Sequence, residues 1–406
     1  MLEWLAIAVL AALTGSCVYV PARLLGGLRR HVRQGPPRGQ AALPPALVIL
    51  PCKASVDERK ELEANLAPVL DQDYPQYRVI FALGDAEDPA RAVVEPLVAR
   101  QPDRAQLVVA EPLPGCSRKI SNQLRALAEV REDEQVYVFL DADARPDRGL
   151  LRRLVEPLSS RDIGVTTGFR WYRPAAGAPW ASWLRAAWNA AGLGMLTDPN
   201  CGYAWGGAMA IRRDVFETCG VAAYWRQALS DDLGLTDAVR QAGHGIYFVP
   251  QALVESPEDL GLRQVIEWTN RQTVICRVYH PRMWRDVFIG EALTLAVVLA
   301  WIAVGVAGFV TGSVAWATLG LIGLTLVLGG RIGYELGIVR AVQRVRPELV
   351  DRTLRFRLAV MAPLITPLLV LNSLRSWLST SICWRGVRYR LLSPRHIEVE
   401  AASAAS

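Results

Sequence analysis

Asp141 and Asp143 are the residues of this sequence whose types and spacing point most directly to chemistry. They follow residues 136–140, an apolar and aromatic run whose shortness and charged flanks favour a buried strand of a parallel sheet. Ligands of open α/β sheets bind where such strands end. Two carboxylates spaced two residues apart can reach one divalent cation, and Mg2+ and Mn2+ prefer oxygen ligands. The pair therefore predicts a metal site whose partner is a diphosphate.

Aspartates also occur in turns for conformational reasons alone, so the pair by itself does not decide between a site and a turn. Its position favours the site. Pro146 ends the strand, and Asp147 can cap a helix predicted over residues 148–158. Asp141 and Asp143 thus lie on a strand-to-helix turn.

Three further charged residues stand at predicted ends of strands or starts of helices. Asp85 follows the predicted strand 77–83 and either accepts hydrogen bonds from a base or ribose or simply opens the next helix. Lys119 begins a helix after a proline-glycine loop, where it either meets phosphate or stays solvated. The acidic pair that ends with Asp232 opens the predicted helix 233–241. A carboxylate there either favours the helix dipole or takes a proton from an attacking hydroxyl.

The predicted helix over residues 262–272 carries a polar and aromatic stripe that is unusual for a core. Gln264, Trp268 and Arg271 fall on its neighbouring turns. Arg271 could add positive charge against a diphosphate.

These residues need a sheet to bring them together. Strands are predicted over residues 46–50, 77–83, 106–110, 136–140, 163–169, 206–211 and 246–249. Helical stretches separate them, which favours right-handed βαβ units and a mostly parallel sheet. No GxGxxG motif follows the first strand, so dinucleotide binding of the usual kind is not expected.

The composition indicates a membrane protein with a large aqueous domain. Of the 406 residues, 51% are hydrophobic, and the apolar residues collect at the N-terminus and after residue 286. The formal net charge of +6, concentrated beside the apolar stretches, suits an anionic membrane surface better than nucleic acid. Seven cysteines without a CxxC pair argue against a disulfide framework and against structural zinc, and favour a reducing compartment.

The sequence predicts four regions. Residues 1–20 form an anchor with its N-terminus outside, residues 21–45 a basic Pro/Gly linker, residues 46–286 the catalytic domain with interface helices, and residues 287–406 a membrane region with a basic tail. Residues 180–195, with three tryptophans, are expected to lie on the bilayer.

The C-terminal membrane region is predicted to begin with a hairpin of residues 287–310 and 314–330, in which Glu291 snorkels to the interface. The basic residues between 331 and 357 place that stretch in the cytoplasm. Residues 358–383 either span the bilayer or are re-entrant. We favour re-entrant, because the arginines that follow would then also face the cytoplasm.

Taken together, the chain resembles the membrane-anchored glycosyltransferases of family 2 with a GT-A fold, and in detail the ceramide glucosyltransferases of family 21. The resemblance covers about residues 46–392. Its most telling stretches are residues 84–90, 118–122, 141–143, 231–232, 264–268 and 384–390.

The resemblance implies roles for several residues. Asp85 would bind the nucleotide, Asp141 and Asp143 the metal and the diphosphate, and Asp232 would be the base that deprotonates the acceptor with inversion at the anomeric carbon. The (Q/R)xxRW motif of the family falls on Gln264 to Trp268, but Glu267 stands where the family usually has arginine. Arg271 is the candidate substitute.

The implied reaction moves a hexose from a nucleotide sugar, a UDP-hexose by resemblance, to the hydroxyl of a membrane lipid such as ceramide or diacylglycerol. Mg2+ or Mn2+ would be the cofactor. The protein would be a multi-pass membrane protein with a cytoplasmic catalytic domain, in the inner or plasma membrane if its source is a bacterium.

Four rival interpretations stay open at this point. A processive polysaccharide synthase shares the motifs but needs a larger transmembrane bundle, and residues 384–390 speak against a polyprenyl-phosphate sugar transferase. A haloacid-dehalogenase-like phosphatase would place the aspartate pair after the first strand. A non-catalytic scaffold would gain nothing from clustered carboxylates. The sequence does not identify the acceptor lipid, the donor sugar or the oligomeric state.

Overall fold

The computed structural model describes residues 2–37, 43–199, 201–257 and 259–400. The chain forms two compact units that are not continuous in sequence. The helical unit comprises Met1–Arg33, Tyr172–Cys201 and Pro257–Thr380, and the sheet unit comprises Gln34–Trp171, Gly202–Ser256 and Ser381–Ser406.

The sheet unit is built on a seven-stranded sheet with the order β3-β2-β1-β4-β6-β5-β7. Its strands are β1 (Ala46–Cys52), β2 (Tyr77–Leu83), β3 (Ala105–Val109), β4 (Val136–Leu140), β5 (Ile163–Tyr172), β6 (Ala208–Arg212) and β7 (Gly245–Ser256). The strands β3, β2, β1 and β4 pair in parallel, whereas β6 is antiparallel to both β4 and β5. The predicted mostly parallel α/β sheet is therefore confirmed.

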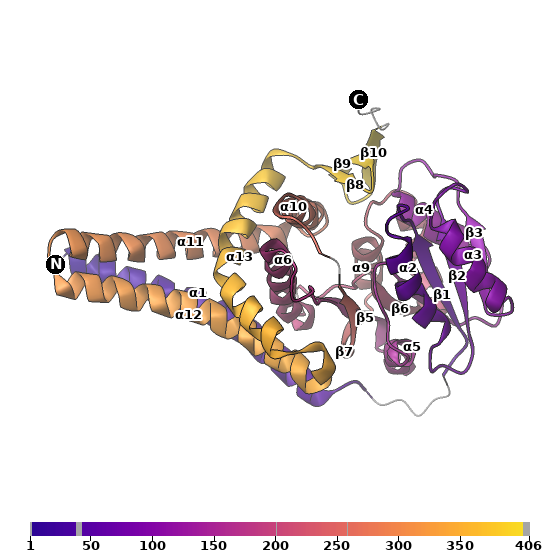
Figure 1. The fold of residues 1–406 in the computed structure, drawn as a ribbon, viewed down its shortest axis with the longest axis horizontal. Helices are drawn as coiled ribbons and strands as arrows, with labels where there is room; N and C mark the ends of the chain where they lie inside the picture. The colour runs from indigo at the N-terminus through magenta and orange to yellow at the C-terminus, as the bar shows by residue number, and fades with distance from the viewer. Residues whose placement is uncertain (1, 38–42, 200, 258, 401–406) are drawn as a thin grey trace. The chain divides into compact units, whose positions relative to one another are not determined.

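Burial explains why these segments form the centre of the sheet. All residues of β2, β4 and β5 are buried, as expected for strands that are covered on both faces. Helices of the same unit connect and cover the strands (Figure 1). They are α2 (Arg59–Leu66), α3 (Arg91–Arg100), α4 (Arg118–Leu127), α5 (Leu150–Val155), α7 (Arg213–Thr218), α8 (Val221–Trp225) and α9 (Asp231–Gln241).

A second, three-stranded antiparallel sheet of β8 (Ser381–Trp384), β9 (Val387–Ser393) and β10 (His396–Glu400) belongs to the same unit. Its contacts with the helices and loops of the first sheet include two hydrogen bonds. Lys53 Nζ donates to the carbonyl oxygen of Arg385 at 2.8 Å, and the amide of Arg118 donates to the hydroxyl of Tyr389 at 3.3 Å.

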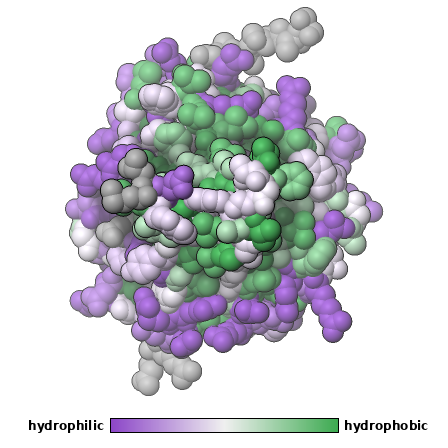
Figure 2. Space-filling model, turned by 90° about the vertical axis from the view of Figure 1, so that its left-hand side faces the viewer, coloured by the Kyte–Doolittle hydropathy of each residue, from purple (hydrophilic) through white to green (hydrophobic). Residues whose placement is uncertain are grey.

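The helical unit contains α1 (Leu2–Gln34), α6 (Trp180–Ala191), α10 (Leu262–Tyr279), α11 (Pro281–Val310), α12 (Val314–Val345) and α13 (Arg352–Leu378). Among the described residues, four helices are long and apolar enough to cross a membrane: α1, α11, α12 and α13. Apolar side chains gather around the hairpin end of α11 and α12, where Phe309 is 85% exposed (Figure 2).

The helical unit corrects two predictions. The helix expected to lie on the bilayer, α6, is buried along most of its length, with Trp183 only 2% exposed. Glu291 does not snorkel, because it accepts hydrogen bonds from Arg331 of α12 at 3.0 Å and Thr366 of α13 at 2.7 Å. Local sequence could not reveal these partners, which lie far away along the chain.

Candidate active site

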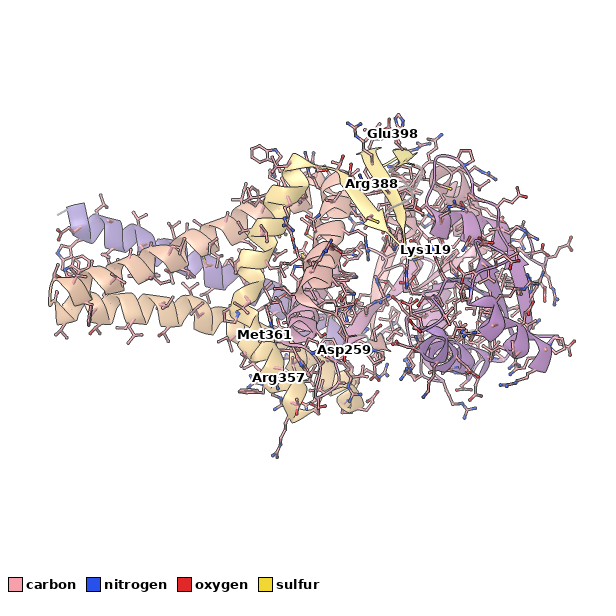
Figure 3. All side chains as sticks on the ribbon, turned by 45° about the horizontal axis from the view of Figure 1, so that its top comes forward. Lys119, Asp259, Arg357, Met361, Arg388 and Glu398 are labelled. Atoms are coloured by element: carbon pink, nitrogen blue, oxygen red, sulfur yellow. The ribbon has the colours of Figure 1, made fainter. Side chains whose placement is uncertain are left out.

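The candidate site lies at the sheet edge where the parallel strands β2, β1 and β4 end. Asp141 and Asp143 come directly after β4, as predicted. Lys119 lies at the start of α4, and Asp231 and Asp232 open α9. The structure thus brings four carboxylates and one ammonium from three distant stretches of the chain to one edge of the sheet. Lys119, which provides the ammonium, is labelled in Figure 3.

Lys119 connects the aspartate pair to the acidic helix start. Its Nζ lies 2.7 Å from Oδ1 of Asp141 and 2.9 Å from Oδ2 of Asp231, and it also donates to the carbonyl oxygen of Gly206 at 3.3 Å. A Cβ at Gly206 would come within 3.1 Å of this ammonium. The absence of a side chain at Gly206 therefore leaves room for Lys119 and Asp231.

Arg170 of β5 is the second cation of the site. It forms a two-pronged pair with Asp143, with distances of 2.7 and 2.8 Å, and its Nη2 also donates to Oδ2 of Asp141 at 2.8 Å. The guanidinium carbon lies 5.2 Å from the centre of the Trp205 ring, a cation–π contact. The two cations thus neutralise both aspartates of the pair.

Asp231 and Asp232 differ in environment although they are adjacent. Asp231 is 3% exposed and accepts a hydrogen bond from Gln123 at 2.8 Å in addition to its pair with Lys119. Asp232 is partly exposed. Its carboxylate accepts from the amides of Gly206 at 3.0 Å and Leu233 at 2.8 Å, and from the hydroxyl of Ser230. Asp232 is therefore the more accessible of the two carboxylates.

The site shifts the pKa values of its members in different directions. Burial raises the pKa of Asp141, and the attraction of Lys119 and Arg170 only partly offsets it. Burial also raises the pKa of Asp231. For Asp143, burial also raises the pKa, but the attraction of Arg170, Arg385 and Lys119 together lowers the pKa to about 2. Burial opposes the charge of Lys119, yet Asp141, Asp231 and Asp232 together raise its pKa. Lys119 and Asp143 are therefore both charged at neutral pH.

The donor set fits a divalent cation that arrives with its own ligands. No group of three or more His, Cys, Asp or Glu side chains suited to a metal occurs among the described residues. Asp141 and Asp143 provide two carboxylates, with side chains 23% and 37% exposed. Mg2+ is commonly held by one or two carboxylates plus substrate phosphates and waters. Two aspartates therefore suffice if a diphosphate completes the shell.

The other predicted site residues belong to both units of the chain. Asp85 follows β2 at the same sheet edge, two strands from β4, and its carboxylate accepts from the amide of Glu87 at 3.0 Å. Gln264, Trp268 and Arg271 lie on α10 in the helical unit. There Trp268 packs edge-on against Tyr172 and Trp188.

Two details of α10 bear on the motif. Gln264 accepts a hydrogen bond from the amide of Gly261 at 2.9 Å and so caps the helix. Glu267 pairs with Arg263 one turn earlier at 2.9 Å. The departure from the family motif is thus accommodated within the helix itself.

The sequence interpretation missed Arg170, Gln123 and the role of Asp231. One signal for Arg170 was available, because it is the only charged residue in the ten residues of β5. A lone cation in a fully buried strand needs a carboxylate partner. For Gln123, an ordinary residue of a helix, the sequence holds no comparable signal.

Lys119→Met should destabilise the sheet unit, because Asp231 and Asp141 both lose the ammonium with which they pair. We expect the free energy of unfolding to fall by about 3 kcal/mol. Hydrogen exchange of the amides in β4 and α9 reports this unit specifically. Adding Asp231→Asn should recover part of the loss, and unchanged protection in the single variant would refute the assigned role of Lys119.

Two solved structures are similar to this chain, and the first of them supports the fold. A mannosyltransferase from Pyrobaculum calidifontis, solved in complex with GDP-Man and Mn2+, superposes with a TM-score of 0.51 at 19% sequence identity, over 84% of this chain and 98% of that chain. Glucosyl-3-phosphoglycerate synthase from Mycobacterium tuberculosis, in complex with phosphoglyceric acid, gives a TM-score of 0.37 at 16% identity, over 63% and 83% of the two chains. The sheet unit has the GT-A glycosyltransferase fold.

The family follows from the sequence as a whole. The model of glycosyltransferase family 21 matches residues 7–397, and the chain belongs to this family. The protein is therefore a glycosyltransferase, which confirms the resemblance drawn from the motifs and rules out the phosphatase and scaffold interpretations.

Proposed function

We propose that the protein transfers a hexose from a nucleotide sugar, a UDP-hexose, to the hydroxyl of a membrane lipid such as ceramide or diacylglycerol, with inversion at the anomeric carbon. The observation that carries the proposal is the convergence of Asp141, Asp143, Lys119, Asp231 and Asp232 at one sheet edge, in a chain that also contains apolar helices of spanning length.

The donor would bind at the ends of the parallel strands. Asp85 would accept hydrogen bonds from the base or ribose, and Asp141 and Asp143 would hold Mg2+ or Mn2+ with the diphosphate. When bound, the cation supplies positive charge to the leaving nucleoside diphosphate. Lys119 fixes the carboxylate of Asp141 at 2.7 Å and so sets its direction before the donor arrives. Gln264, Trp268 and Arg271 of α10 remain proposed donor contacts on the strength of the motif alone.

Asp232 would take the proton of the acceptor hydroxyl. It is partly exposed, and two backbone amides hold its carboxylate in one orientation, as a general base requires. Asp231 is a poorer candidate, because it is buried and its charge is used by Lys119. Direct attack by the deprotonated hydroxyl on the anomeric carbon would invert its configuration.

The acceptor is proposed to be a lipid because the same chain carries the apolar helices. The basic residues at the ends of α1, α12 and α13 support a cytoplasmic sheet unit, since cytoplasmic segments of membrane proteins are enriched in Lys and Arg.

Mass spectrometry of lipids from a host that expresses the chain tests this function. Cells with the wild-type protein should accumulate a lipid heavier by one hexose, and cells with Asp141→Asn should not. Fragmentation identifies both the sugar and the lipid. A polymer without a lipid, or a hexose on a polyprenyl phosphate, would contradict the proposal and favour one of the two remaining rivals.

A further inference from the structure

The order of the elements limits how often the chain can cross a membrane. Residues 202–256 and 381–400 belong to the same sheet unit and therefore lie on the same side. The helices between them that could cross are α11, α12 and α13. Because both ends of this stretch lie on one side, the number of crossings within it must be even.

The helices α11 and α12 account for two crossings. They are antiparallel, because Gly308 closely approaches Ala317 and, further from the turn, Gly305 approaches Gly320. The helix α1 packs along them and runs parallel to α12, since Trp4 stacks on Trp316 and Val18 lies against Gly330. A crossing by α13 would separate β8–β10 from the Lys53 and Arg118 contacts that hold them in the sheet unit.

The surface of α13 also fits a helix with one face in lipid. Large apolar side chains point outward at a spacing of three to seven residues, namely Phe356, Val360, Leu364, Leu371 and Leu374, which are 40–66% exposed. The opposite face is buried and mixes apolar side chains, such as Leu358 and Ile365, with polar ones. There Asn372 donates to Thr269 of α10 at 2.8 Å, and Thr366 bonds Glu291 of α11. The exposed face therefore differs from that of a helix on a water-soluble protein, where exposed side chains are mainly polar or charged.

Arginines flank this apolar face at both ends of α13. Arg352 and Arg357 stand near its start and Arg375 near its end. Figure 1 shows α13 running across α11 and α12 and not alongside them, and Figure 3 labels Arg357 and Met361 on α13. Cationic side chains at both ends suit the headgroups of one leaflet.

We propose that α13 lies in the plane of the membrane, with Phe356, Val360, Leu364, Leu371 and Leu374 at the boundary between headgroups and acyl chains. The protein then crosses the bilayer three times, through α1, α11 and α12. The bound partner of this face is the lipid surface of the leaflet next to the sheet unit. This inference depends on connectivity and exposure and not on the proposed transfer reaction.

Spin labels test the depth of α13 directly. Single cysteines replace Val360, Leu364, Leu371 or Leu374 in a variant whose seven cysteines are changed to alanine and which keeps the wild-type unfolding midpoint. In vesicles of phosphatidylcholine and phosphatidylglycerol, the accessibility of each label to oxygen and to a water-soluble nickel complex reports its depth. We expect the four labels to lie at one shallow depth.

The matched control is α11, which is also long, apolar and exposed. Labels at Ile289, Leu299 and Val306, which are 56–58% exposed, should show a depth that changes along the helix. A graded depth along α13, with its middle residues deepest, would overturn the proposal. Labels on α13 that are fully accessible to the nickel complex would also overturn it, because the face would then be in water.

A second observation, independent of the first, concerns Arg170. Its guanidinium engages both oxygens of Asp143 and one oxygen of Asp141, while Lys119 engages the other oxygen of Asp141. The oxygens that a divalent cation would use are therefore already paired with fixed positive charge. The Arg170 side chain is 8% exposed, so this pairing is little screened by water.

We infer that Arg170 is a positioning residue that competes with the divalent cation for Asp141 and Asp143. The metal enters with the nucleoside diphosphate of the proposed donor, and Arg170 then pairs with a diphosphate oxygen in place of the carboxylates, as the planar guanidinium does readily. The site would thus have low affinity for free metal and higher affinity for the metal with its nucleotide. The inference rests on the proposed donor only in this last step.

The substitution Arg170→Gln should change two affinities in opposite directions, namely the affinity for free Mn2+ and the affinity for UDP. Electron paramagnetic resonance of free Mn2+ measures metal binding without nucleotide, and we expect Arg170→Gln to bind Mn2+ about tenfold more tightly. Calorimetry with UDP in saturating Mn2+ should show about tenfold weaker binding. Arg170→Lys, which keeps the charge but cannot bridge both carboxylates, should fall between wild type and Arg170→Gln.

Arg78→Gln is the matched control. Arg78 is equally buried and forms a two-pronged pair with Glu134, but it lies near the start of β2, at the sheet edge opposite to Asp141. Its Mn2+ affinity should equal that of the wild type. Unchanged Mn2+ affinity in Arg170→Gln would overturn the inference. Tighter Mn2+ binding with unchanged UDP affinity would support the competition between Arg170 and the metal for Asp141 and Asp143. It would contradict the proposed pairing of Arg170 with a diphosphate oxygen.

Discussion

Asp232→Asn is expected to reduce the rate of sugar transfer by about 10³-fold while nucleotide binding survives. An amide cannot accept the proton of the acceptor hydroxyl, so the attacking oxygen stays weakly nucleophilic. The substitution preserves the size of the side chain, and its single oxygen can still accept from one of the two amides, of Gly206 or of Leu233. The hydroxyl of Ser230 still accepts from the amide of Leu233 at 3.3 Å and caps the helix. The fold of α9 should therefore persist. Initial rates of transfer and calorimetry with UDP measure the two effects separately.

Asp237→Asn provides the control for this substitution. Asp237 lies on the same helix but bonds the hydroxyl of Tyr224 at 3.0 Å. The same chemical change at this position should leave the transfer rate within about twofold of wild type. Wild-type turnover in Asp232→Asn would refute the assignment of the base. Loss of both transfer and UDP binding would instead indicate a disrupted site.

Removal of divalent metal is the second change with a large expected effect. Treatment with a chelator should lower transfer at least about 100-fold, because the departing diphosphate then has no cation to stabilise its developing charge. Added Mg2+ or Mn2+ should restore the rate. Titration of each metal against initial rate measures the requirement and ranks the two ions.

Asp141→Asn connects the metal requirement to the site. This variant loses the carboxylate that faces both Lys119 and Arg170, so added metal should restore little or no activity. Full activity of the wild-type protein in chelator would show that the reaction does not need a divalent metal. Restoration of Asp141→Asn to the wild-type rate by Mn2+ would show that the ion binds elsewhere.

The sequence predicted the centre of the fold well because the physical signals there are local. Residues 136–140 are an uninterrupted apolar run, and residues 77–83 are apolar or aromatic except for Arg78. They form β4 and β2 with these bounds. The polar residues after such strands must share an edge when the strands are parallel. The position of Asp141 and Asp143 therefore followed from the pattern.

The rest of the site depends on tertiary contacts that no local pattern encodes. Arg170 is 27 residues away from Asp143 along the chain, and its partner becomes evident only when β5 is placed next to β6 in the sheet. The tryptophans of α6 suggested a membrane interface, whereas α10, α12 and α13 cover that helix. An apolar helix face looks the same in sequence whether lipid or protein covers it.

The most direct test of the central claim is transfer by the purified protein in lipid vesicles. The protein is incubated with a nucleotide sugar that carries tritium in the hexose, and the label is followed into the organic phase and into free sugar. We expect the wild-type protein to transfer label into lipid only when Mg2+ or Mn2+ is present. The Asp141→Asn variant should transfer none. Label that appears solely as free sugar, or lipid labelling that persists in Asp141→Asn, would contradict the claim.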